Sequence, residues 1–334
     1  MALAAVLVVG CGANGDERLE EPLEVAGETC ERCPERAHFP EMAVPADNAL
    51  SDARIDLGRH LFYDKRLSGN GAQACAGCHR QELAFSDGRV LPEGSTGHVI
   101  PRNAPSLANV GYLPVYTWVN PLLYTLEKQA MVPLFADLVV ELGVSGRERE
   151  VLERLSADAT YPDLFARAYP EGPPAALSWD NILRALASFQ RSLVSNRAPY
   201  DRYLQGEEDA ISDAAKRGLA LFESDRLSCS RCHEGFNFTR AVRTREQERW
   251  KDSFVNTGLY NTSDPGGYPR DNPGLNEISD DPADIGRFRV PSLRNVAVTA
   301  PYMHDGSLPT LSAVLDHYAR GGMLTASGPR AGDG

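Results

Sequence analysis

The sequence contains one unit twice, and each copy ends in the pattern Cys-x-x-Cys-His. The first copy is LGRHLFYDKRLSGNGAQACAGCH at 57–79 and the second is RGLALFESDRLSCSRCH at 217–233. Further matches follow in the same order: PSLANV at 105–110 with PSLRNV at 291–296, then blocks beginning at Thr125 and Thr310. Three matched blocks in parallel order predict two related domains that diverged after a duplication.

A Cys-x-x-Cys-His motif is typical of covalent c-type haem attachment. Its two thiols share one turn, where they can add to the two vinyl groups, and the histidine then lies beneath the iron. A zinc or redox pair is the alternative for a single motif, but two copies inside a repeat favour haem. We therefore predict two covalently bound haem c groups, attached through Cys75, Cys78, His79, Cys229, Cys232 and His233.

The spacing of apolar residues predicts a mainly α fold made of two tandem cytochrome c-like haem domains with long irregular loops. Ser51 and Ser212 are typical N-caps for helices that lead into the two motifs. A third helix is expected to begin near Ser178 and end before Asn196, as a core helix that bridges the domains. The Pro- and Gly-rich stretches 88–105 and 261–275 are expected to be irregular.

The N-terminus has the pattern of an exported lipoprotein. The apolar start MALAAVLVVG runs into Cys11, which predicts a signal, a lipid on Cys11 and a tether over 1–44. No basic residue precedes the apolar stretch, which predicts a natural start farther upstream. The haem domains are then predicted at 45–200 and 201–334.

Cys30 and Cys33 lie in CERCP, where no histidine follows the second cysteine. A local disulfide is expected for this pair in an oxidising periplasm, and a metal site is the alternative.

Charge and hydropathy exclude two classes of function. The formal net charge of −12 argues against a nucleic-acid partner, which calls for a basic surface. No internal apolar run approaches the length of a spanning helix, so the lipid is the predicted contact with a membrane.

The blocks RNAPSLANV, LEKQAMVP, PSLRNVAVTAPYMHDG and TLSAVLDHY resemble those of the bacterial dihaem cytochrome c peroxidase and MauG superfamily. The resemblance runs from about Leu50 to the end of the chain. Within the superfamily, GRHLFYDKRLS, TWVNP at 117–121 and VELG at 140–143 are most similar to the MbnH branch, whose members oxidise a tryptophan on a partner protein.

The resemblance implies a distal ligand for the second haem iron, eight residues after the threonine of the last block. That residue is Met in the peroxidases and Tyr in MauG, and here it is Tyr318. A phenolate is a hard anionic donor that lowers the reduction potential, whereas a thioether favours the reduced iron. Tyr318 therefore points away from a simple peroxidase. His317 and Met323 are the alternative ligands.

For the first haem, the resemblance implies an open iron face with Gln129 and Glu141 as catalytic residues. A carboxylate there can move a proton of peroxide. His98 corresponds to a removable distal histidine of the peroxidases and is a candidate ligand or a solvated loop residue. Trp118 occupies the position that relatives use between the haems, where an indole lets oxidising equivalents pass in two hops.

Asn103, Thr299 and Pro301 match the calcium ligands of the family, an amide oxygen and backbone carbonyls suited to a hard cation. Calcium at the domain junction would fix the geometry between the haems. Relatives usually continue into a last helix, so the resemblance also predicts that the sequence is truncated at Gly334, which puts the packing over Tyr318 in doubt.

Together these residues predict a hydrogen-peroxide-dependent dihaem oxidase of the periplasm. The two haems would share a high-valent state through Trp118 and modify a partner protein, with a tryptophan converted to kynurenine. A lipid-anchored or periplasmic copper-binding protein is one candidate partner. The alternatives are a cytochrome c peroxidase that takes electrons from a small cytochrome and a dihaem electron carrier without enzymatic activity.

Overall fold

The computed structural model describes residues 30–35, 37–170, 177–249, 253–260, 268–322, 324–325 and 332–333. The predicted lipid site Cys11 and the alternative ligand Met323 lie outside these residues. The α-helices are α1 Asp52–Tyr63, α2 Cys75–Cys78, α3 Leu126–Phe135, α4 Glu148–Ser156, α5 Thr160–Ala168, α6 Trp179–Ser192, α7 Pro199–Leu204, α8 Asp213–Glu223, α9 Asn276–Ser279 and α10 Leu311–Arg320.

The remaining elements are short. The 3₁₀ helices are η1 Ala46–Asn48, η2 Lys65–Leu67, η3 Gln81–Leu83, η4 Val110–Tyr112, η5 Glu208–Ala210, η6 Cys229–Arg231, η7 Pro282–Asp284 and η8 Val296–Val298. The strands pair antiparallel as β1 Val242–Arg243 with β2 Glu248–Arg249, β3 Phe254–Asn256 with β4 Arg287–Arg289, and β5 Leu324–Thr325 with β6 Gly332–Asp333. The chain is thus mainly helical, as predicted.

The three predicted serine caps begin their helices. The hydroxyls of Ser51, Ser178 and Ser212 accept hydrogen bonds from backbone N–H groups in the first turns of α1, α6 and α8. These bonds satisfy donors that have no partner inside the helix. The stretch 88–105 and the described residues 268–275 contain no helix or strand, as expected from their Pro and Gly content.

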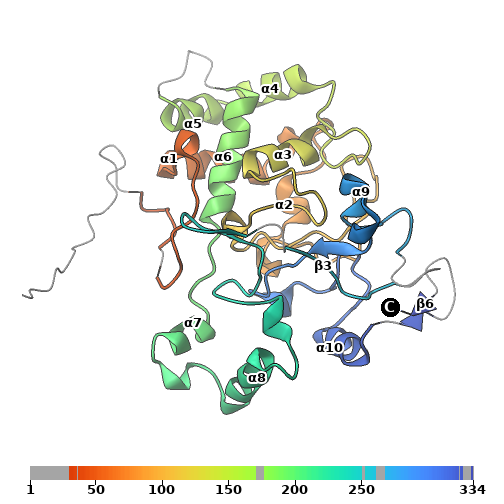
Figure 1. The fold of residues 1–334 in the computed structure, drawn as a ribbon. Helices are drawn as coiled ribbons and strands as arrows, with labels where there is room; N and C mark the ends of the chain where they lie inside the picture. Colours follow the sequence, from red (N-terminus) through yellow and green to blue (C-terminus); the bar gives the residue numbers. More distant parts are fainter. Residues whose placement is uncertain are drawn as a thin grey trace, which may run out of the picture.

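The first half of the chain has the larger core, in which α1, α3, α5 and α6 pack together (Figure 1). α1 and α6 cross closely at Gly58, where a Cβ would lie 2.0 Å from the carbonyl oxygen of Ala185. The sequence led us to expect α6 as a bridge between domains. Instead, its apolar face, with Ile182 and Leu186, is buried against first-half helices because α1 presents a matching stripe.

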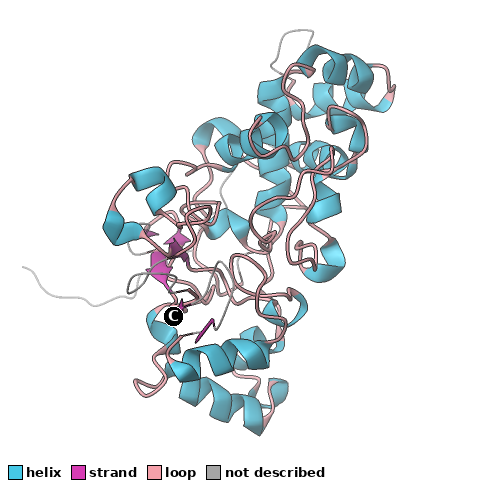
Figure 2. Ribbon diagram, turned by 90° about the vertical axis from the view of Figure 1, so that its right-hand side faces the viewer, coloured by secondary structure: helices cyan, strands magenta, loops and turns pink. Residues whose placement is uncertain are grey.

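In the second half, α7, α8 and α10 lie below the helices of the first half in the view of Figure 1. Helices and long loops make up most of the structure, and the strands are short (Figure 2). The second half has much less buried apolar surface of its own. α8 contains no buried residue, and Leu221 and Leu227 are 46% and 49% exposed. No helix within the described residues is long and apolar enough to cross a membrane.

Residues 37–44, which we predicted as the end of a tether, pack instead at the junction of the two halves. Phe39 and Met42 are buried with Tyr112, and the Phe39 ring also contacts the ring of Phe236 at 4.7 Å. The predicted disulfide between Cys30 and Cys33 is present and is confirmed.

Candidate haem sites

The two repeated units place their histidines in the same way. The Nδ1 atom of His79 hydrogen-bonds the carbonyl oxygen of Phe85 at 2.8 Å, and Nδ1 of His233 hydrogen-bonds that of Phe238 at 3.0 Å. Both phenylalanines have positive φ angles, 61° and 48°. Because a carbonyl can only accept, Nδ1 carries the proton, which leaves the lone pair of Nε2 for a metal.

The repeated PSL blocks hold these carbonyl turns. Ser106 Oγ donates to the carbonyl oxygen of Ala84 at 2.6 Å, and Ser292 Oγ donates to that of Asn237 at 2.6 Å. In both halves the acceptor is the residue just before the phenylalanine. Burial lowers the pKa of His79 and of His233, with backbone carbonyls opposing the shift, so both imidazoles are neutral near pH 7. Neutral imidazole is the form that binds a metal.

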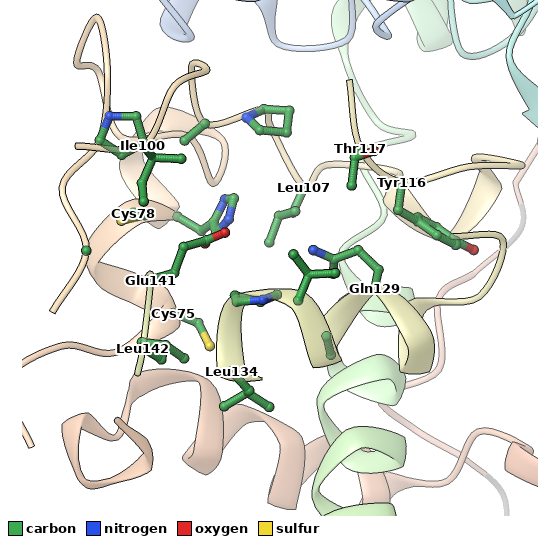
Figure 3. A pocket seen from close by; sticks show the side chains of 18 of the residues that line it. Cys75, Cys78, Ile100, Leu107, Tyr116, Thr117, Gln129, Leu134, Glu141 and Leu142 are labelled. Atoms are coloured by element: carbon green, nitrogen blue, oxygen red, sulfur yellow. The ribbon is translucent and has the colours of Figure 1, made fainter. Parts of the chain in front are cut away.

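A cavity of about 280 Å³ lies beside the first motif (Figure 3). Cys75, Cys78 and His79 form one side of it. Its walls are mostly apolar, with Phe62, Leu107, Val110, Leu126, Leu134, Leu142 and Leu186 among them. An apolar cavity that offers two thiols and one imidazole nitrogen fits a covalently bound haem.

Glu141 and Gln129 reach this cavity from opposite sides (Figure 3). Gln129 lies on α3, whereas Glu141 lies in the segment after it, which folds back because Leu142 N donates to Pro133 O at 2.8 Å. Gly94 permits this return, since a Cβ there would lie 2.0 Å from the carbonyl oxygen of Val140. Burial raises the pKa of the Glu141 carboxyl to about 7, so that it can bind and release a proton near neutrality.

The helices α3 and α10 are equivalent but differ at one decisive position. Thr125 caps α3 and Thr310 caps α10, and each helix has ten residues. Eight residues after each threonine stand Pro133 in α3 and Tyr318 in α10. Pro133 lines the first cavity, and its side chain has no atom that can bind a metal. The eight-residue spacing from each threonine is the signal in the sequence that identifies this difference.

Tyr318 lies near the second motif. Burial raises the pKa of its hydroxyl to about 12, with smaller contributions from Cys232, Tyr268 and Cys229, although half of the side chain is exposed. Because charge effects of this kind fall off with distance, Tyr318 lies within electrostatic range of the two cysteines. The neighbouring His317 is buried, and its Nε2 hydrogen-bonds the carbonyl oxygen of Thr257 at 2.8 Å. Nε2 of His317, the alternative ligand, is therefore already hydrogen-bonded within the protein.

Exposed apolar side chains lie in the segment that leads into the second motif and on α10. Leu221 and Leu227 both precede the motif in the chain and are exposed, and Leu315 on α10 is 66% exposed. Apolar surface of this extent is unfavourable in water, and the flat face of a haem would cover it. The residues around the second motif thus fit the same cofactor.

Trp118 lies between the two halves. Its indole Nε1 donates to the carbonyl oxygen of Asn103 at 2.8 Å, and it lines the first cavity. It also packs against an apolar cluster of the second half that includes Tyr260, Tyr268 and Phe288. His98, by contrast, is exposed and does not line the cavity, although its carbonyl accepts a hydrogen bond from Gly94.

The segments that carry the predicted calcium ligands contact one another at the junction of the halves. Asn103 N donates to the carbonyl oxygen of His304 at 2.8 Å, and a Cβ on Gly88 would lie 4.0 Å from the carbonyl oxygen of Ala300. Thr299 and Pro301 flank Ala300. The side-chain amide of Asn103 donates to the carbonyl oxygen of Arg89 at 2.7 Å.

The fold and these sites define a c-type cytochrome with two haem sites. Residues 52–209 match a family described as di-haem cytochrome c peroxidase, and residues 288–323 match one described as RoxA-like, cytochrome c-like. The methylamine utilization protein MauG of Methylorubrum extorquens is 36% identical over 278 residues, 83% of this chain and 72% of that protein. A cytochrome-c peroxidase of a Pseudomonas species is 34% identical over 313 residues, 86% of this chain and 78% of that protein.

A crystal structure of a MauG-like protein associated with microbial copper homeostasis superposes with a TM-score of 0.87 and 45% identity. The match covers 92% of this chain and 87% of that one. The chain belongs to the family of dihaem cytochrome c peroxidases and MauG. It is a dihaem, peroxide-dependent oxidoreductase with two haem c groups.

Proposed function

We propose that this protein uses hydrogen peroxide to oxidise a residue of a partner protein, a tryptophan that becomes kynurenine. The observation that carries the proposal is the contrast between Pro133 and Tyr318 at equivalent positions of α3 and α10. The first site would then leave room for peroxide, and Tyr318 would offer the second haem an oxygen donor that tolerates electron loss.

The cofactors are attached through the two motifs. Cys75, Cys78 and His79 would hold the first haem, and Cys229, Cys232 and His233 the second, with Tyr318 as a further ligand of the second haem. The bound haem supplies the redox chemistry with peroxide. The Phe85 and Phe238 carbonyls orient the two imidazoles for this purpose.

Glu141 and Gln129 prepare peroxide for reaction in the first cavity. The Glu141 carboxylate accepts a proton from peroxide and returns it to the departing oxygen, which its pKa of about 7 permits. The Gln129 amide orients peroxide from the opposite side (Figure 3). The apolar walls keep bulk water away from this proton transfer.

Trp118 carries oxidising equivalents between the halves. Its contacts with both the first cavity and the second-half aromatic cluster support this role. The substrate is proposed to be a periplasmic or lipid-anchored protein that binds copper, because the MauG-like relative with 45% identity is associated with copper homeostasis. The predicted export and c-type attachment agree with a periplasmic site of action.

The test is mass spectrometry of the partner. Candidate exported copper-binding proteins are incubated with the haem-loaded enzyme and peroxide, and their tryptophan peptides are analysed. We expect conversion of one tryptophan to kynurenine that requires both enzyme and peroxide, and about 100-fold less product with Trp118→Phe. If Trp118→Phe gives as much product as the parent enzyme, the relay role is wrong.

A cytochrome c peroxidase is the second candidate, favoured by the 34% identity to such an enzyme. It predicts rapid peroxide consumption with a reduced small cytochrome as electron donor and no modified residue on a partner protein.

Calcium bound by the Asn103 side-chain oxygen and the Thr299 and Pro301 carbonyls is proposed to fix the junction. Removing it with a chelator is expected to slow the response of the second haem to peroxide at least about tenfold while both haems stay attached. Stopped-flow absorption of each haem checks this. Calcium, but not magnesium, should restore the rate, since Mg²⁺ dehydrates reluctantly. An unchanged rate after proven calcium removal contradicts the proposal.

A further inference from the structure

Arg289, the last residue of β4, is a buried cation for which the described part of the chain offers no counter-charge. Its side chain is among the most buried polar groups, with 3% exposure. Its Nε donates to the carbonyl oxygen of Thr117 at 3.0 Å, and Nη1 makes only a 3.5 Å contact with the carbonyl oxygen of Val290. No carboxylate among the residues that the structure describes forms a salt bridge with it. Burial lowers its pKa to about 10, and no nearby charge offsets that effect.

Two other buried arginines of this chain are each paired with a carboxylate. Arg191 binds both oxygens of Glu127 at 2.7 and 2.9 Å, and Arg294 binds both oxygens of Asp201 at 2.7 Å. Arg102 lines the first cavity, but it is already paired with Glu277. Buried charges in proteins are paired, because an isolated charge loses its hydration without compensation. The unpaired guanidinium of Arg289 therefore indicates an anion that comes from outside the polypeptide.

The position of Arg289 identifies the source of that anion. Its backbone N–H donates to the carbonyl oxygen of Trp118 at 2.8 Å, and the Thr117 carbonyl that it binds belongs to a residue at the edge of the first cavity (Figure 3). Pro291, two residues farther on, has its carbonyl beside His233 of the second motif. Arg289 thus lies between the two haem sites. Each haem c brings two carboxylates, and guanidinium binds carboxylate with two parallel hydrogen bonds.

We propose that Arg289 binds a propionate of one of the two haems and fixes that haem against the Thr117–Trp118 backbone. Arg289 is then a positioning residue: it holds a haem edge at a set place relative to the Trp118 indole. The positive charge also keeps that propionate ionised across the neutral range of pH.

The direct test is a crystal structure of the haem-loaded protein. We expect the Arg289 guanidinium within about 3 Å of a haem carboxylate. A guanidinium that contacts only protein carbonyls and water, or a chloride ion in place of the propionate, would overturn the proposal. This arm needs no variant and so does not depend on folding of a mutant.

The second test measures the haem reduction potentials of Arg289 variants by spectroelectrochemistry. Arg289→Met is expected to lower the reduction potential of one haem and to make that potential pH-dependent near neutrality, because the propionate loses its counter-charge. Arg289→Lys keeps the charge and should restore most of the shift. The matched control is Arg287→Met on the same strand, since Arg287 is partly exposed and paired with Asp284. Identical potentials and pH profiles in Arg289→Met and the parent protein would contradict the proposal.

Discussion

Replacing Glu141 with glutamine is expected to slow the reaction of the diferric holoenzyme with peroxide about 100-fold or more, the usual effect of removing a general base. Glutamine retains the shape of the side chain but cannot accept a proton. Stopped-flow absorption with stoichiometric peroxide measures the rate. In the parent enzyme this rate should rise as pH increases through about 7, because only the ionised carboxylate accepts the proton. The profile of the variant should be flat over the same range.

The free energy of unfolding shows whether the slower rate of Glu141→Gln comes from lost chemistry or from a less stable protein. The folded pKa of about 7 lies above the ordinary value of 4.5, so the stability contributed by the protonated carboxyl is complete below pH 4.5 and is lost as pH rises through about 7. Glu141→Gln should therefore unfold no more easily than the parent at pH 8. Glu153→Gln on the exposed face of α4 is the matched control and should react at the parent rate. A parent-like rate in Glu141→Gln would remove this residue from the mechanism.

Replacing Tyr318 with phenylalanine is expected to reduce oxidation of the partner protein about 100-fold, because the second iron loses an anionic ligand that sets its potential. The first haem should still react with peroxide, since Tyr318 lies on α10 and is not among the residues that line the first cavity. Product is measured by mass spectrometry, and the ligand change by the absorption spectrum of the second haem. Tyr124→Phe, an exposed tyrosine next to the cap of α3, is the control. An unchanged ligand field in Tyr318→Phe would favour the cytochrome c peroxidase alternative.

Local patterns allowed much of the fold to be predicted from the sequence. Serine caps and apolar spacing located α1, α6 and α8, because both signals lie within a few residues of the helix that they define. The duplicated motifs likewise predict where the two haem c groups are attached. The serines of the PSL blocks explain why those blocks recur, since each holds the turn that binds its histidine.

What the sequence did not reveal depends on contacts between distant residues. The packing of Phe39 against Phe236 joins segments nearly two hundred positions apart, and no local pattern marks it. The return of Glu141 to the cavity depends on a backbone bond between Leu142 and Pro133. The isolation of Arg289 became visible only once every carboxylate around it was placed. The exposed face of α8 has a different cause in our proposal, in which the second haem covers it.

The asymmetry between the halves is the physical basis of the proposed activity. Both copies of the repeated unit contain a histidine that is hydrogen-bonded to a backbone carbonyl. Both also contain a helix that begins with a threonine cap, α3 in the first copy and α10 in the second. The two copies differ at one helix position, Pro133 in α3 and Tyr318 in α10, and we propose that this difference gives the two sites their different roles. Pro133 leaves space for an oxidant beside Glu141 and Gln129, and Tyr318 offers an oxygen donor to the other site.

The most direct measurement of this asymmetry is low-temperature electron paramagnetic resonance combined with magnetic circular dichroism of the diferric holoprotein. We expect one high-spin iron with a single imidazole ligand and one six-coordinate iron bound by imidazole and phenolate. Thioether or bis-imidazole coordination at the second iron would contradict this expectation, and so would a first iron with both axial positions filled by protein.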